Sequence, residues 1–177
     1  MVKSSTFGFH CIFFYYGKAH LMVNLYQYIK IGIQKNEYVY LNVDNELFKS
    51  IIDYFSDEEK EQIKMFSLRN GVIISDTFNE FQRNVIENGY SAARVIWDAG
   101  FLINELGRDT FINIEKTTSE IIAGLKVSLM CIYDFDNYIN LGTIINKKLI
   151  EEIYKNYDHK FYKMQLIEIW KLNLIFE

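Results

Sequence analysis

The residues with the clearest chemical potential stand where an apolar run ends. Residues 10–18 read HCIFFYYGK, so Gly17 and Lys18 follow directly on a run rich in aromatic side chains. A strand that ends in Gly-Lys and leads into a helix is typical of phosphate-binding P-loops. In such loops backbone N–H groups wrap the phosphates, the lysine neutralises charge and a hydroxyl binds Mg²⁺. The segment therefore points first to a nucleotide site.

Two of the four fixed positions of that motif are missing. The pattern G-x-x-x-x-G-K-[ST] needs a glycine where this chain has Ile12, and a hydroxyl where it has Ala19. The phosphate cradle and the metal ligand are both lost, so we expect no ordinary nucleotide hydrolysis. Lys18, at the start of the predicted helix, remains a candidate for binding another anion. The alternative is that Gly17 makes the turn and Lys18 is solvated.

Acidic and tyrosine side chains stand at the predicted ends of several strands. Asp98 closes the apolar run VIWD, Tyr133 and Asp134 close CIYD, and Tyr15 and Tyr16 close the first strand. Ligands of open α/β sheets bind outside the carboxyl ends of the strands. We therefore expect these residues to line one pocket for a small organic ligand. Helix capping by Asp98 and Asx turns at the other acids are the alternatives.

The sequence shows no spacing typical of a metal site or a catalytic nucleophile. His10 and Cys11 are adjacent, so in a strand they face opposite sides and do not easily share a metal. His20 and His159 stand alone, and C-x-x-C, H-x-x-H and H-E-x-x-H are absent. Neither Cys11 nor Cys131 has a nucleophile signature. We therefore expect no metal, no cofactor and no catalytic residue.

Short apolar runs alternate with helical patterns along the chain. Strands are predicted at 9–16, 37–43, 63–68, 72–76, 93–97 and 126–135. Helices are predicted at 18–36, 46–55, 56–63, 77–89, 110–125 and 146–157, with another directly after residue 97. The tail 164–177 fits either a helix or a strand. This order predicts an α/β fold, a three-layer sandwich with a mostly parallel central sheet.

Composition narrows the class of protein. The 177 residues, half of them hydrophobic, suit one domain over 1–177, and the net charge of −4 argues against nucleic acid or a membrane as a partner. No apolar run reaches the roughly 18–20 residues that span a bilayer, and the start of the chain lacks the apolar core of a signal peptide. The two cysteines lie in apolar runs, as expected of buried thiols in a reducing compartment. We therefore expect a cytoplasmic protein.

Several segments together resemble one family, the MEDS domain, a sensory domain of methanogens, methylotrophs and the dichloromethane-responsive repressor. The matching positions are His10, Tyr15 or Tyr16, Gly32, Glu37, Gly89, Tyr90, Arg94, Cys131, Tyr133 and Asp134. No one of them is diagnostic, but their order and spacing carry the resemblance over about residues 7–160. Residues 161–177 would then be a C-terminal extension.

The resemblance implies a RecA/KaiC-like fold with a degenerate P-loop and a sensory role. Such a domain would bind a small ligand and act through a protein partner such as a sensor kinase or a transcription regulator. Together with the strand-end residues, the expected ligand-binding set is His10, Tyr15, Tyr16, Lys18, Arg94, Asp98, Tyr133 and Asp134. Two alternatives stay open. One is a divergent nucleotide-binding protein, and the other is an interaction module or homodimer that uses the apolar tail LIEIWKLNLIF.

Overall fold

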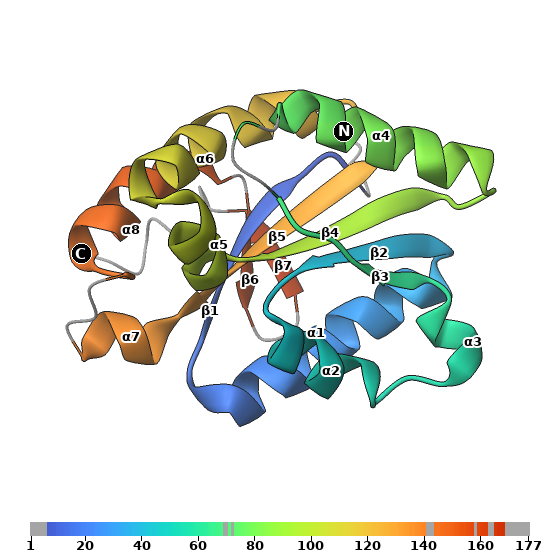
Figure 1. The fold of residues 1–177 in the computed structure, drawn as a ribbon, viewed down its shortest axis with the longest axis horizontal. Helices are drawn as coiled ribbons and strands as arrows, with labels where there is room; N and C mark the ends of the chain where they lie inside the picture. Colours follow the sequence, from blue (N-terminus) through green and yellow to red (C-terminus); the bar gives the residue numbers. More distant parts are fainter. Residues whose placement is uncertain are drawn as a thin grey trace.

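A central sheet carries strands from most of the chain (Figure 1). The computed structural model describes residues 7–68, 71, 73–140, 144–157, 159–162 and 165–168. Its strands are β1 (His10–Tyr15), β2 (Glu37–Asn42), β3 (Ile63–Met65), β4 (Ala92–Asp98), β5 (Val127–Asp134), β6 (His159–Tyr162) and β7 (Gln165–Glu168). They lie in the order β3-β2-β4-β5-β1-β6-β7, and every neighbouring pair is parallel except β6 with β7. The prediction of a mostly parallel sheet is confirmed.

Helices cover both faces of this sheet (Figure 1). They are α1 (Gly17–Gln34), α2 (Asn45–Ile52), α3 (Asp57–Lys60), α4 (Ile74–Glu87), α5 (Ala99–Leu106), α6 (Arg108–Ile122), α7 (Phe135–Ile139) and α8 (Lys147–Ile153), followed by a 3-10 turn at Tyr154–Asn156. The apolar sides of α1 and α2 fill one core with alternate residues of the strands, such as Cys11 and Phe13. Helices α4, α5, α6 and α8 fill a second core with the other alternate residues, such as Ile12. These two cores are the signature of the predicted three-layer α/β sandwich.

Most predicted elements are confirmed within a few residues, one differs in kind, and α7 and β6 were not predicted. The predicted strand 72–76 is wrong for its described part, because Ile74 begins α4. Ile74, Phe78, Phe81 and Val85 are all buried, and their spacing continues one helical row rather than an alternating strand. Helix α7 was not predicted; Asp134 starts it by accepting hydrogen bonds from the N–H groups of its first turn. In the tail, 165–168 form a strand, and 169–177 lie outside the described residues.

A buried ion pair joins Arg94 and Glu37, and Gly32 packs against it; the resemblance had singled out all three positions. Arg94 in β4 donates from Nε to Glu37 of β2 over 2.6 Å and from Nη1 to the carbonyl of Tyr28 in α1 over 2.7 Å. Its guanidinium also lies 4.2 Å from the centre of the Tyr28 ring. Gly32 makes room for this arrangement, since a Cβ there would stand 2.8 Å from Arg94 Nε. The ion pair therefore fixes α1 against β2 and β4.

We predict that Arg94→Leu lowers the free energy of unfolding by about 3–5 kcal/mol, because it leaves the Glu37 carboxylate buried without a partner. The double variant with Glu37→Leu should recover much of that loss. Urea unfolding measures both. As a control, Lys60→Ala removes the exposed pair with Asp57 and should cost less than about 1 kcal/mol. An equally small loss for Arg94→Leu would show that the buried pair is not needed.

Candidate functional site

The first strand runs into the first helix without a phosphate-binding loop. Tyr15 ends β1, Tyr16 is the single residue between, and Gly17 begins α1 with a φ of 69°. Such a positive φ is readily adopted by glycine, which explains this residue at the turn. The Tyr16 N–H donates to Nδ1 of His20 over 3.0 Å. The backbone of this turn therefore does not form the cradle of a P-loop.

A carboxylate of the protein itself occupies the start of α1. The N–H of Gly17 donates to Oδ2 of Asp136 over 2.9 Å, so Asp136 takes a place where an anionic ligand would otherwise bind a helix N-terminus. Lys18 is exposed and donates to Ser50 Oγ in α2 over 3.4 Å. A phosphate group at this turn would meet the negative charge of Asp136. The arrangement thus disfavours nucleotides for a physical reason that the sequence motif alone did not reveal.

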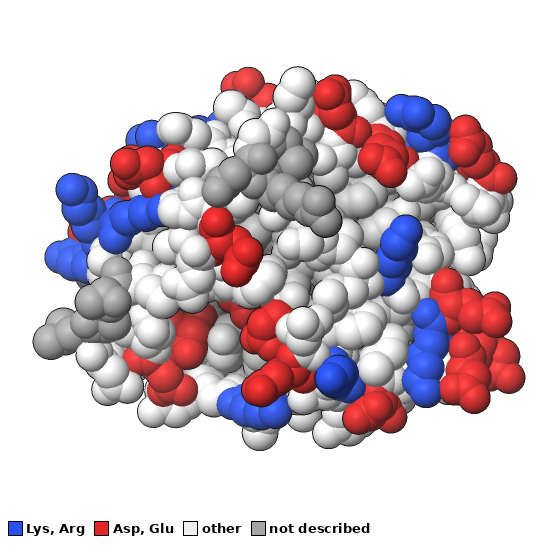
Figure 2. Space-filling model, viewed as in Figure 1, with Lys and Arg blue, Asp and Glu red and all other residues white. Residues whose placement is uncertain are grey.

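Three further aspartates lie at the same edge of the sheet, each as the cap of a helix. Asp44 caps α2, Asp98 caps α5 and Asp134 caps α7, with their carboxylates accepting from backbone N–H groups. The four acids surround Tyr15: burial, and then the charges of Asp98, Asp134, Asp44 and Asp136, raise the pKa of its phenol. Figure 2 shows acidic side chains gathered over this end of the molecule, at its lower left. The predicted meeting of Tyr15, Asp98 and Asp134 at one sheet edge agrees with this geometry.

Asp98 is the most perturbed of these acids. Burial raises its pKa from 3.8 to about 6, an effect that the N–H groups of Phe101 and Gly100 partly offset and that the charges of Asp44 and Asp134 reinforce. A shift of this kind is typical of carboxyl groups in ligand sites, although a capping carboxylate in a crowded acidic edge shows it too. Burial disfavours the ionised carboxylate, so Asp98 stabilises the folded protein less as the pH rises and its proton is lost.

We predict that Asp98→Asn stabilises the protein by about 1–2 kcal/mol at pH 7.5, since asparagine caps a helix equally well without a charge. The folded-state pKa of about 6 lies above the ordinary 3.8, so stability contributed by the bound proton is lost as the pH rises between these values. The gain of the variant should therefore fall to about half at pH 5. Urea unfolding at the two pH values tests this. A destabilised variant at both would mean that the charge of Asp98 is needed.

Two buried polar side chains near this edge were not predicted as site residues. Asn42 ends β2, Trp97 lies opposite it in β4, and both are fully enclosed. Neither amide atom of Asn42 nor the indole N–H of Trp97 has a hydrogen-bond partner among the residues that the structure describes. Buried polar groups are normally paired, so these atoms at the ends of two strands are candidates for pairing with a ligand. The signal in the sequence was a polar residue closing the apolar run EYVYLN.

The other predicted residues lie elsewhere or only border this edge. Tyr16 is exposed beside Lys18. Tyr133 is buried and shares a hydrogen bond of 2.6 Å with the hydroxyl of Tyr157. Arg94 is held in the ion pair with Glu37, away from the carboxyl ends of the strands. Their predicted roles in binding a ligand remain predictions.

His10 begins β1 and so lies at the opposite end of that strand from Tyr15. Burial lowers the pKa of its imidazole to about 3, so the ring is neutral. Among the described residues, His10, Glu115 and Cys131 are the side chains whose atoms come close enough to hold a metal ion together. Sequence spacing did not predict this group, since its members come from β1, α6 and β5.

Comparison with known proteins identifies a family. The sequence model of MEDS, the methanogen/methylotroph, DcmR sensory domain, matches residues 9–141. No curated protein matches the chain. None of the described helices is long and apolar enough to span a membrane.

Two solved structures share the fold over 90% of this chain, each with a TM-score of 0.50. One is a KaiC-like protein from the hyperthermophilic archaeon Pyrococcus horikoshii, with 10% identity over 76% of that chain. The other is the flagellar accessory protein FlaH from Methanocaldococcus jannaschii, with 11% identity over 75% of that chain. At such identities the likeness concerns the fold alone, which is KaiC/RecA-like as predicted.

Proposed function

The chain belongs to the MEDS sensory-domain family, and on that premise we propose that it is a non-catalytic sensor of a small, unphosphorylated organic molecule. The ligand binds at the carboxyl ends of β1, β2, β4 and β5, and the bound state is passed to a protein partner in signalling, such as a kinase or a transcription regulator. The observation that carries the proposal is the pairing of Asp136 with the Gly17 N–H, at the point where a nucleotide-binding relative would hold phosphate.

The chemistry of this edge narrows the ligand. Four aspartates around Tyr15 repel anions and attract groups that donate hydrogen bonds or carry positive charge. Asn42 offers a donor and an acceptor, and Trp97 offers a donor, all enclosed and unpaired among the described residues. A hydroxyl or amine on a compact carbon skeleton satisfies both demands, since it fills apolar space and pairs these atoms.

We predict that Asn42→Leu raises the free energy of unfolding of the ligand-free protein but abolishes its response to ligand. The variant removes two unpaired buried amide atoms at nearly constant volume, so the ligand-free protein should gain about 1–2 kcal/mol in unfolding free energy. It should at the same time lose the thermal shift that small alcohols and amines produce in the unaltered protein. A thermal-shift screen, with native mass spectrometry of the hits, measures both.

The matched pair for this screen is Tyr15→Phe and Tyr54→Phe. Tyr15 is half-buried among the aspartates, whereas Tyr54 is 63% exposed, and each change removes only one hydroxyl. Loss of response in the first and not in the second would place the ligand at this edge. If no compound in the screen shifts the unaltered protein, or if hits act equally on Asn42→Leu, the proposed site is wrong.

A divergent nucleotide-binding protein is the competing function, because the shared fold occurs in a KaiC-like protein. Under our proposal, calorimetry with Mg-ATP gives no binding heat at high micromolar protein. Asp136→Ala should allow weak phosphate or nucleotide binding at the freed Gly17 N–H. Tight Mg-ATP binding by the unaltered protein that Lys18→Ala abolishes would instead favour the nucleotide-binding alternative.

A further inference from the structure

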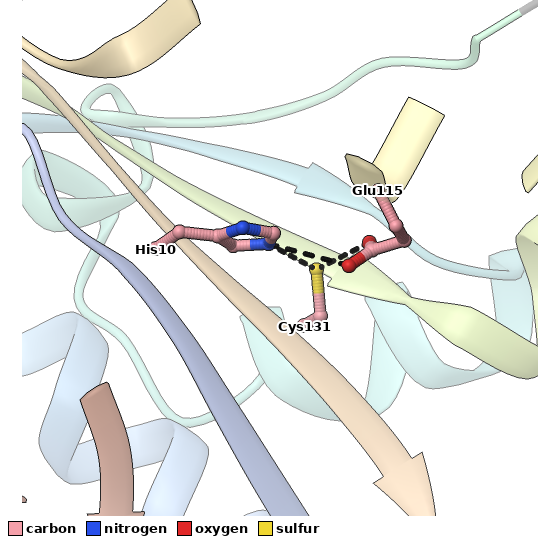
Figure 3. A group of neighbouring side chains, drawn as sticks. All are labelled: His10, Glu115 and Cys131. Atoms are coloured by element: carbon pink, nitrogen blue, oxygen red, sulfur yellow. Dashed lines mark hydrogen bonds and ion pairs between the residues drawn. The ribbon is translucent and has the colours of Figure 1, made fainter. Parts of the chain in front are cut away.

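Three side chains from distant parts of the sequence converge in the core beneath α6 (Figure 3). His10 starts β1 and Cys131 lies in the neighbouring β5, where it pairs with Ile12. Because residues two apart in a strand share a face, His10 and Cys131 both point toward the side covered by α6. Glu115 reaches them from that helix. Cys11, the neighbour of His10, points into the opposite core.

The ligand atoms meet around a single point. Nε2 of His10 lies 3.4 Å from Sγ of Cys131 and 3.5 Å from Oε2 of Glu115. Sγ of Cys131 lies 3.2 Å from Oε1 of Glu115. In a tetrahedral zinc site with bonds of about 2.0–2.3 Å, nitrogen, sulfur and oxygen ligands are separated by about 3.4–3.6 Å. The contacts of His10 and Cys131 run to different oxygens of Glu115, and all three distances are close to the spacing that the metal requires.

The imidazole is held in the tautomer that a metal needs. Ser119, one helical turn after Glu115, donates its hydroxyl hydrogen to the carbonyl of Asn156. Its oxygen thus accepts from Nδ1 of His10 over 3.0 Å, which leaves Nε2 unprotonated toward Cys131 and Glu115. Metal-binding histidines are typically fixed in this way by a hydrogen bond from the other ring nitrogen.

Burial and charge favour a divalent cation at this point. All three residues are fully enclosed, and Oε2 of Glu115 has no hydrogen-bond partner among the described residues. A thiolate and a carboxylate carry two negative charges, which one divalent ion balances, so the complex with a neutral imidazole has no net charge in the core. The Tyr157 ring, 4.2 Å from the His10 ring between centres, closes the site on another side.

We propose that His10, Glu115 and Cys131 form a closed zinc(II) site that joins β1, β5 and α6. Nitrogen, oxygen and sulfur are the ligand types that Zn²⁺ binds. Because one oxygen of Glu115 faces His10 and the other faces Cys131, the three residues offer the ion four ligand atoms. The ion replaces the weak contacts among these side chains by bonds between three elements. The site lies at the other end of β1 from the proposed ligand edge. A result that contradicts the zinc site would therefore leave the proposed sensory function untouched.

Metal content of the purified full chain tests the proposal. Protein produced with zinc in the medium and dialysed should hold about one zinc per chain by mass spectrometry of the elements. Cys131→Ala should lose nearly all of it. Cys11→Ala is the matched control, because it removes an equally buried thiol from the opposite face and should keep the metal. Equal zinc content in the two variants would overturn the assignment.

Cobalt substitution keeps the test valid if Cys131→Ala fails to fold. Unaltered protein refolded with Co²⁺ should show a thiolate-to-cobalt charge-transfer band and the intense visible bands of tetrahedral cobalt. Glu115→Gln should weaken Co²⁺ binding at least about tenfold, because it removes one charged ligand. Absence of the charge-transfer band, together with less than about 0.1 zinc per chain after refolding with zinc, would refute the site.

Discussion

The parallel pairing of β1 with β5 sets the positions of both proposed sites. The register places Tyr15 opposite Asp134 at one end, and it brings Cys131 within reach of His10 toward the other. Both strands are buried on their two faces, so a shift of one residue would turn every side chain into the wrong core. The acidic edge and the buried cluster are therefore consequences of one strand pairing.

The turn after β1 shows how a KaiC-like fold can join its first strand and helix without a phosphate-binding loop. Helix α1 begins one residue after the end of β1, and its N-terminus attracts negative charge. Here Asp136, from the helix after β5, supplies that charge from within the chain. Because Asp134 starts this helix by capping it, a local capping interaction also presents Asp136 to the turn. The sequence motif shows that the first P-loop glycine is missing, but only the structure shows that Asp136 takes the place of an anionic ligand at the start of α1.

The sequence predicted the elements best where local energetics decide. The helix predicted at 56–63 starts with a capping box of Ser56 and Glu59, and Asp98 caps the helix after β4. Local patterns failed at residues 74–76, because a run of apolar residues too short to show a period was assigned to a strand rather than to the first turn of α4. Glu115 was overlooked, although it stands in the buried row of α6 between Phe111 and Thr118, where an acid is unexpected.

The sequence by itself determined the α/β class, the alternation of strands and helices, and the absence of a complete P-loop motif around Gly17 and Lys18, since periodicity, capping and motif residues act over a few positions. Only the tertiary structure decided which polar groups meet. Arg94 in β4 pairs with Glu37 in the neighbouring β2, and His10 contacts Glu115, which is more than one hundred residues away in the sequence. Strand order and register, which depend on packing the whole chain around two cores, fix these contacts, and no local spacing encodes them.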